Sequence, residues 1–112
     1  MRGGKSGRLT MVFLVLETYR IRAKHREAYL AAVPKIVKNG MDLGCVWFEV
    51  YEDDDTPNLF TEMMAFDSWT HYQRLRSIPQ SREIEAITRD LDTWIEGGLD
   101  AIETTYLKSV ID

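Results

Sequence analysis

The chain carries one pattern twice: a strand, a helix and a second strand follow one another in residues 11–52 and again in residues 59–111. No insertion is large enough to be a second domain. Helices in such a pattern cover only one face of the sheet, whereas these strands carry apolar or aromatic residues on both faces. The second face must be covered by something else, either another copy of the chain or a ligand.

Two strands and a helix are predicted in the first unit. The apolar run MVFLVL at 11–16 is typical of a strand buried on both faces. Residues 23–38 have apolar side chains at helical spacing, and Pro34 within them predicts a kink or an irregular turn. The Asn-Gly pair at 39–40 is a helix-stop signal, and residues 45–52 form the next strand.

The second unit is bounded by caps and breakers. The acidic segment 53–58 lacks the glycine and the distal glutamate of an EF-hand, so we interpret it as a solvated hairpin turn. The remaining elements are a strand at 59–66, a helix capped by Asp67-Ser68 and broken at Pro79, a longer helix capped by Ser81 and ended by Gly97-Gly98, and a last strand at 101–111.

The order β–α–β–β–α–β predicts an α+β, ferredoxin-like fold, in which a four-stranded antiparallel sheet has its helices on one face. Alternation along the first strand gives an aliphatic set and a mixed set. We expect the aliphatic set (Val12, Leu14 and Leu16) to meet the helices. The open face would then expose Phe13, Val15, Trp47, Tyr51, Phe60 and Phe66. A patch of this kind is larger than a monomer normally exposes, which predicts a homodimer with its sheets face to face.

Composition limits the class of protein. We interpret residues 1–9 as a disordered leader and residues 10–112 as a single domain. The formal charge of −4 argues against a nucleic-acid partner, and no apolar run is long enough to suggest a membrane span. Cys45 is the only cysteine, so no intramolecular disulfide can form, and we expect a cytoplasmic protein.

One segment carries a resemblance to a known family. The sequence LFTEMMAFDSWTHYQRLRSI at 59–78 resembles the third-strand and helix signature of the dimeric α+β barrel superfamily, in its antibiotic biosynthesis monooxygenase branch. Glu62, Phe66, Ser68 and Tyr72 stand where that branch has a strand glutamate, an aromatic residue, a serine and a helical aromatic residue. The segment ETYRI at 17–21 is similar to the exit of its first strand.

The resemblance implies a dimeric α+β barrel with a pocket between sheet and helices. Members of the superfamily include cofactor-independent monooxygenases of aromatic compounds, haem-degrading monooxygenases, isomerases and cyclases. Haem-degrading members use an asparagine at the end of the first strand, a helical tryptophan and a histidine iron ligand. In this chain the asparagine position looks like Tyr19, the tryptophan position falls near Leu75, and the histidine position falls near Glu85 or Ile84. We therefore expect neither haem degradation nor a cofactor.

Three side chains are candidate acids or bases. Glu49 and Glu62 lie among apolar neighbours on adjacent predicted strands, where a carboxyl can have a raised pKa. The alternative is that each pairs with an arginine or lies at the dimer seam. His71 lies in the first turn of its helix, near the expected pocket. Neither His71 nor His25 has a metal-binding partner at i+3 or i+4, so we expect no metal site.

Aromatic residues could form the walls of a ligand site. The candidates for substrate binding are Tyr19, Trp47, Tyr51, Trp69 and Tyr72. Packing in the core or in a dimer interface is the alternative for each of them.

The leading hypothesis is a cofactor-independent monooxygenase that acts on a small aromatic or polycyclic compound. One alternative is a non-catalytic ligand-binding or stress-associated dimer, and another is a lyase or isomerase that uses a glutamate as base. Pairing of the pocket carboxylates with Arg20, Arg22 or Arg76 would favour the binding protein. An unpaired carboxylate or His71 in a cavity would favour an enzyme.

Overall fold

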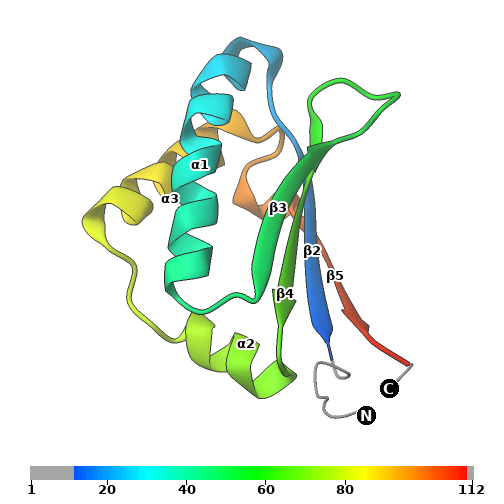
Figure 1. Cartoon of the computed structure of the whole chain (residues 1–112). Helices are drawn as coiled ribbons and strands as arrows, with labels where there is room; N and C mark the ends of the chain where they lie inside the picture. Colours follow the sequence, from blue (N-terminus) through cyan, green and yellow to red (C-terminus); the bar gives the residue numbers. More distant parts are fainter. Residues whose placement is uncertain (1–11, 111–112) are drawn as a thin grey trace.

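The computed structural model describes residues 12–110, so the predicted leader lies outside the described part of the chain. The elements are β2 (Phe13–Arg20), the 3₁₀ turn η2 (Ala23–His25), α1 (Arg26–Asp42), β3 (Trp47–Glu52), β4 (Leu59–Phe66), α2 (Trp69–Arg76), α3 (Arg82–Trp94), the 3₁₀ turn η3 (Leu99–Ala101) and β5 (Glu103–Lys108) (Figure 1). This order confirms the doubled strand–helix–strand pattern.

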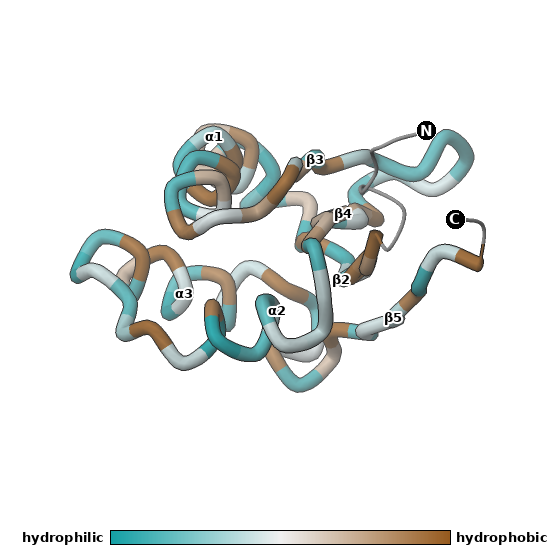
Figure 2. Tube along the Cα trace, turned by 60° about the horizontal axis from the view of Figure 1, so that its bottom comes forward, coloured by the Kyte–Doolittle hydropathy of each residue, from teal (hydrophilic) through white to brown (hydrophobic). Residues whose placement is uncertain are grey.

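The sheet has four strands in the order β3-β4-β2-β5, and every neighbouring pair is antiparallel. Helices α1 and α3 lie on one face of it, with α2 near one end, and the opposite face carries no helix of the described chain (Figure 1). In the end-on view of Figure 2, α1 and α3 again lie together on one side of the strands. The predicted ferredoxin-like α+β fold is confirmed.

The predicted assignment of the sheet faces was wrong for the first and third strands. Val15 and Phe66 are fully buried and Phe60 is 3% exposed, and with Phe13 they lie on the helix-covered face. Ring contacts explain this orientation, because Phe13 and Phe66 both pack against Tyr72 of α2, at 6.2 and 5.1 Å between ring centroids. The run at 11–16 is apolar in both phases, so alternation separates two sets without saying which one meets the helices.

The open face of the sheet therefore carries the aliphatic set. The register places Leu14 opposite Ala65, which lies opposite Trp47 on its other side, and places Leu16 opposite Met63. Trp47 and Tyr51 lie on this face, as predicted, and Tyr51 is 50% exposed. The open face is thus apolar and aromatic even though its residues from β2 differ from those expected.

Helix α1 runs past the predicted stop at 39–40 and ends at Asp42. Gly40 is a buried helical residue, and a Cβ there would lie 2.3 Å from Phe48 Cδ2, so the glycine lets α1 approach β3 closely. The residue that ends the helix is Gly44, whose φ of +110° is one that side chains other than glycine rarely adopt. The Asn-Gly pair therefore lies within the helix, where Gly40 allows a close contact with β3, and does not form a turn.

The predicted caps are confirmed at both later helices. The Ser68 hydroxyl accepts from the backbone N–H of His71 at 3.1 Å, and the Ser81 hydroxyl accepts from that of Ile84 at 3.2 Å. A serine that accepts such a bond satisfies an N–H group that has no partner within the helix. These two caps fix where α2 and α3 begin relative to β4.

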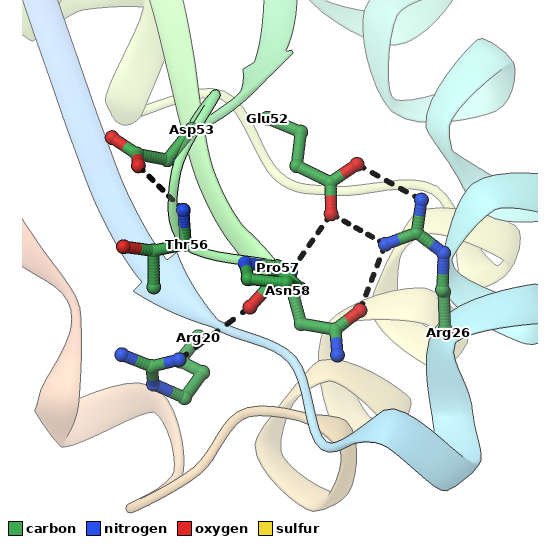
Figure 3. Close-up of polar contacts among 7 residues, drawn as sticks. All are labelled: Arg20, Arg26, Glu52, Asp53, Thr56, Pro57 and Asn58. Atoms are coloured by element: carbon green, nitrogen blue, oxygen red, sulfur yellow. Dashed lines mark hydrogen bonds and ion pairs between the residues drawn. The ribbon is translucent and has the colours of Figure 1, made fainter.

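A polar clamp joins the start of α1 to the β3–β4 hairpin (Figure 3). Arg26 donates to the Glu52 carboxylate at 2.5 and 2.9 Å and to the Asn58 side chain at 2.8 Å, while the Asn58 N–H donates to Glu52 at 2.8 Å. These bonds hold the pKa of Glu52 at about 2. Asp53 accepts from the N–H of Thr56 at 2.8 Å, which confirms that the acidic segment forms a turn.

Candidate active site

A cavity of about 240 Å³ lies between the sheet and the helices α1 and α3. Most of its wall is apolar, with Phe48 and Met64 from the sheet, Ile36 from α1, and Ile84 and Leu91 from α3. Its only charged wall residues within the described chain are Glu17 and Glu62. A cavity with an apolar wall and a few convergent polar groups is the usual form of a small-molecule site.

The two glutamates face each other across neighbouring strands. Glu17 of β2 is directly opposite Glu62 of β4 in the antiparallel register, and such partners have Cβ atoms roughly 4.5–5.5 Å apart. Because residues two apart share a face, Glu17 follows Val15 onto the helix-covered side, and Glu62 follows Phe60. The sheet register therefore places two carboxyl groups together at the cavity wall.

Burial changes the ionisation of both groups. Glu62 is 7% exposed, and burial first, then the charge of Glu17, raise its pKa to about 7, against the opposing effect of a hydrogen bond from Tyr19. Burial also raises the pKa of Glu17, opposed by the positive charge of Arg76. A carboxyl whose pKa lies near neutral pH can both accept and return a proton.

A tyrosine pair supports the Glu62 carboxyl. The Tyr19 hydroxyl donates to Glu62 Oε2 and lies 2.8 Å from the Tyr29 hydroxyl. Since Tyr19 has one proton to donate and gives it to Glu62, Tyr29 must donate to Tyr19. Burial raises the pKa of both tyrosines, so both stay protonated and the chain of donors toward Glu62 persists at neutral pH.

Of the predicted site residues, Tyr19 and Glu62 line the cavity and lie together. Glu49 lies on the opposite face of the sheet, where its exposed carboxylate accepts from the Tyr51 hydroxyl, and Trp47 lies on that face with them. These three residues therefore do not line the cavity.

The two predicted aromatic residues of α2 form a separate cluster. Trp69 and Tyr72 pack with Phe13 and Tyr106, with ring centroids 5.4–6.2 Å apart. Burial, followed by a hydrogen bond with Tyr106, raises the pKa of Tyr72 to about 12. Neither Trp69 nor Tyr72 is part of the cavity wall.

His71 packs against the end of β4 and does not line the cavity. Its ring is edge-on to Phe66, 5.7 Å between centroids, and its Nδ1 lies 4.0 Å from the Asp67 carboxylate. His71 is not among the described residues that line the cavity. This placement leaves Glu62 as the predicted acid or base that reaches the cavity.

Glu17 and Tyr29 were missed as site residues by the sequence reasoning. Alternation along the strand does place Glu17 on the same face as Tyr19. If that face is known to meet the helices, this alternation is enough to predict that Glu17 lies near Tyr19 in the site. Tyr29 lies on the apolar stripe of α1 and resembles any core aromatic residue in the sequence. Only the three-dimensional contact with Tyr19 distinguishes it.

None of the three arginines considered above pairs with the cavity carboxyls in the described structure. Arg20 donates to the Pro57 carbonyl at 3.5 Å, and Arg22 donates to the Thr93 carbonyl at 3.3 Å. Arg76 lies over the Tyr72 ring, 5.7 Å from its centroid. The arginine pairing expected of a binding protein is therefore absent among residues 12–110.

Residues 12–110 contain no group of three or more His, Cys, Asp or Glu side chains placed to hold a metal ion. The same residues contain no helix with the length and apolar character needed to cross a bilayer.

No family model matches the sequence, and no curated protein matches it either. Solved structures do match the fold. A conserved protein from Methanosarcina mazei Go1 has a TM-score of 0.73 at 11% identity, over 89% of this chain and 94% of that one. A protein titled "Putative antibiotic biosynthesis monooxygenase" from Nitrosomonas europaea has a TM-score of 0.72 at 10% identity, over 95% and 96%. A protein with the same description from Deinococcus radiodurans has a TM-score of 0.70 at 15% identity, over 89% and 94%. The fold that the resemblance predicted is therefore confirmed.

Proposed function

We propose that this protein is a cofactor-independent monooxygenase-like enzyme that acts on a small aromatic compound, with Glu62 as its general base. The observation that carries the proposal is the Glu62 carboxyl itself, which is buried at the wall of an apolar cavity, accepts from Tyr19 and faces a second carboxyl. The likeness to structures described as antibiotic biosynthesis monooxygenases supports the same class of reaction at the level of the fold.

The chemistry needs a base and a dry site. Glu62 removes a proton from a C–H or O–H group that the aromatic ring of the substrate acidifies, and the resulting anion transfers electrons to O₂. For a ring methylene, the methylene and O₂ give a ring ketone and water, so the substrate supplies all the electrons that reduce O₂. The proton held by Glu62 returns to the peroxide anion before water leaves.

The volume of the cavity limits the size of substrate that can bind. Ligand pockets for drug-sized compounds span about 300–1,000 Å³, whereas this cavity has about 240 Å³. A compact aromatic compound therefore fits better than a polycyclic one. Phe48 and Met64 provide apolar wall on the sheet side of the cavity.

Oxygen consumption with a panel of compact hydroxylated aromatic compounds tests the proposal. We expect uptake by the wild-type protein, and a loss of about 10²–10⁴-fold in Glu62→Gln, because general-base catalysis contributes a factor of this size. Glu49→Gln makes the same change on the opposite face of the sheet and should retain the rate. Equal rates in wild type and Glu62→Gln would refute Glu62 as the base.

A lyase or isomerase is the second candidate, because the facing carboxyls can move a proton between two substrate positions without oxygen. The two reactions separate under anaerobic conditions in deuterium oxide. An isomerase would incorporate deuterium into its product at an undiminished rate, whereas a monooxygenase would form no oxygenated product.

We infer that the working form is a cytoplasmic homodimer. Leu14, Leu16 and Met63 lie on the sheet face that no described helix covers, and Leu107 there is 45% exposed. An apolar face of this kind is normally covered by a partner. The cavity lies on the opposite side of the sheet, so face-to-face pairing would leave it accessible to a small aromatic or apolar ligand.

A further inference from the structure

Glu17 is a carboxyl at the cavity wall without a bonded partner. In the described structure it forms no hydrogen bond and no ion pair, although its neighbour Glu62 accepts from Tyr19. Carboxylates away from water normally have a cation or hydrogen-bond donors beside them. The structure thus leaves at the cavity wall one charged group whose partner must come from water or from a ligand.

The surrounding charges favour a cationic ligand. Glu17 and Glu62 are the only charged residues of the cavity wall, and no lysine, arginine or histidine is among its described lining residues. Arg76 acts on Glu17 through its positive charge, but its guanidinium lies over the Tyr72 ring and forms no ion pair with Glu17. A ligand carboxylate would meet two like charges in this cavity, whereas a ligand ammonium would meet two opposite charges.

The two carboxyls also differ in what they can do. Glu62 is fixed by the Tyr19 hydroxyl at Oε2, and its Oε1 has no bonded partner in the described chain. Glu17 is less deeply buried than Glu62, so its charged form is less costly to maintain. One carboxyl is therefore held in place as a base, while the other remains to bind a charged group of the ligand.

We propose that the cavity selects an apolar, aromatic compound that carries a protonated amine, and that Glu17 binds this ammonium group while Glu62 faces the reacting position. This inference rests on the cavity of the proposed function and names the substrate class for it. It does not depend on oxygen chemistry, because the binding preference holds before any reaction takes place.

Isothermal titration calorimetry with three matched probes tests the inference. Benzylamine, benzyl alcohol and benzoate share one ring and differ in the charge of the polar group, which is positive, neutral and negative at pH 7.5. We expect benzylamine to bind at least about tenfold more tightly than benzyl alcohol, and benzoate to bind more weakly than the alcohol.

Two variants assign the preference to its residue. Glu17→Gln keeps the shape of the side chain and should remove most of the excess affinity for benzylamine over benzyl alcohol, with the alcohol affinity unchanged. The Glu62 carboxyl accounts for the preference that remains. Glu49→Gln, on the opposite face of the sheet, should keep the full preference. Circular dichroism of each variant establishes that it is folded, and retained alcohol binding establishes that its cavity is intact.

Three outcomes would overturn the inference: benzoate binding as tightly as benzylamine, a preference for the amine that is undiminished in Glu17→Gln, or no measurable binding of benzylamine at millimolar concentration. These outcomes are distinct from failure of the proposed function. A wild-type protein that prefers the amine but consumes no oxygen with any aromatic compound would contradict the monooxygenase alone and leave the assigned ligand class standing.

Discussion

Replacing Glu62 by glutamine should stabilise the protein while removing the proposed base. The folded protein holds the pKa of Glu62 at about 7, compared with an ordinary value of 4.5. Between these two pH values the unfolded chain has released its proton and the folded chain still holds it. Stability therefore falls as pH rises through this window, since it follows the number of protons bound in the unfolded state minus that in the folded state.

The shift in the Glu62 pKa determines how much the free energy of unfolding changes. Each pKa unit corresponds to about 1.4 kcal/mol, so Glu62 lowers the free energy of unfolding by about 3 kcal/mol between pH 4.5 and pH 8. Glutamine does not titrate, and it can still accept from Tyr19. The Glu62→Gln variant should therefore gain about 3 kcal/mol relative to wild type over this interval, with the two proteins closest in stability at the acidic end.

Urea unfolding at a series of pH values from 4.5 to 8 measures this difference. The protein concentration must be held fixed, because stability depends on concentration if the chain dimerises. Glu49→Gln serves as the matched control, since it makes the same change on the other face of the sheet, away from the cavity. A Glu62→Gln difference that stays constant across the series would refute the argument that burial of this carboxyl opposes its ionisation.

Two other predictions concern the donor chain and the open face. Tyr19→Phe removes the hydrogen bond that lowers the Glu62 pKa, so the acidic limb of the pH–rate profile should move to higher pH. The substitution also leaves the buried Tyr29 hydroxyl without its partner, so the free energy of unfolding should fall by about 1–3 kcal/mol. An unchanged pH profile would contradict this. Leu16→Lys introduces a charge on the uncovered sheet face, and light scattering should find twice the 13.0 kDa chain mass for wild type and a single chain mass for the variant. A wild-type monomer would contradict the dimer.

Much of the architecture could be predicted because local signals agree with it. The third strand was predicted at 59–66 and is β4 (Leu59–Phe66), since a β-favouring run there is followed at once by the Ser68 cap. Helix ends were less predictable. Gly40 has the composition of a stop signal, but its packing against Phe48 is a contact between α1 and β3 that no local pattern reveals.

The faces of the sheet were the main error, and it had a definite cause. A strand with apolar residues in both phases can be turned either way, and Glu17 and Tyr19 made their own face look like the solvated one. In the fold that polar end lies under α1 and α3, because Tyr19 bonds to Tyr29 of α1 and to Glu62 of β4. A sequence pattern predicts whether a polar residue is exposed from the type of that residue alone. Whether the residue is in fact buried depends on bonding partners that are distant in the chain.

The carboxyl pair is the clearest case of such a partnership. Glu17 and Glu62 are 45 positions apart in the sequence and become neighbours only through the register of β2 on β4. An apolar residue at either position would avoid the cost of burying a charge and would extend the wall formed by Phe48 and Met64. The fold instead carries two facing carboxyls at its cavity, which lowers its own stability at neutral pH. A buried carboxyl at a cavity wall, oriented by a tyrosine pair, supports the proton-transfer role proposed for Glu62.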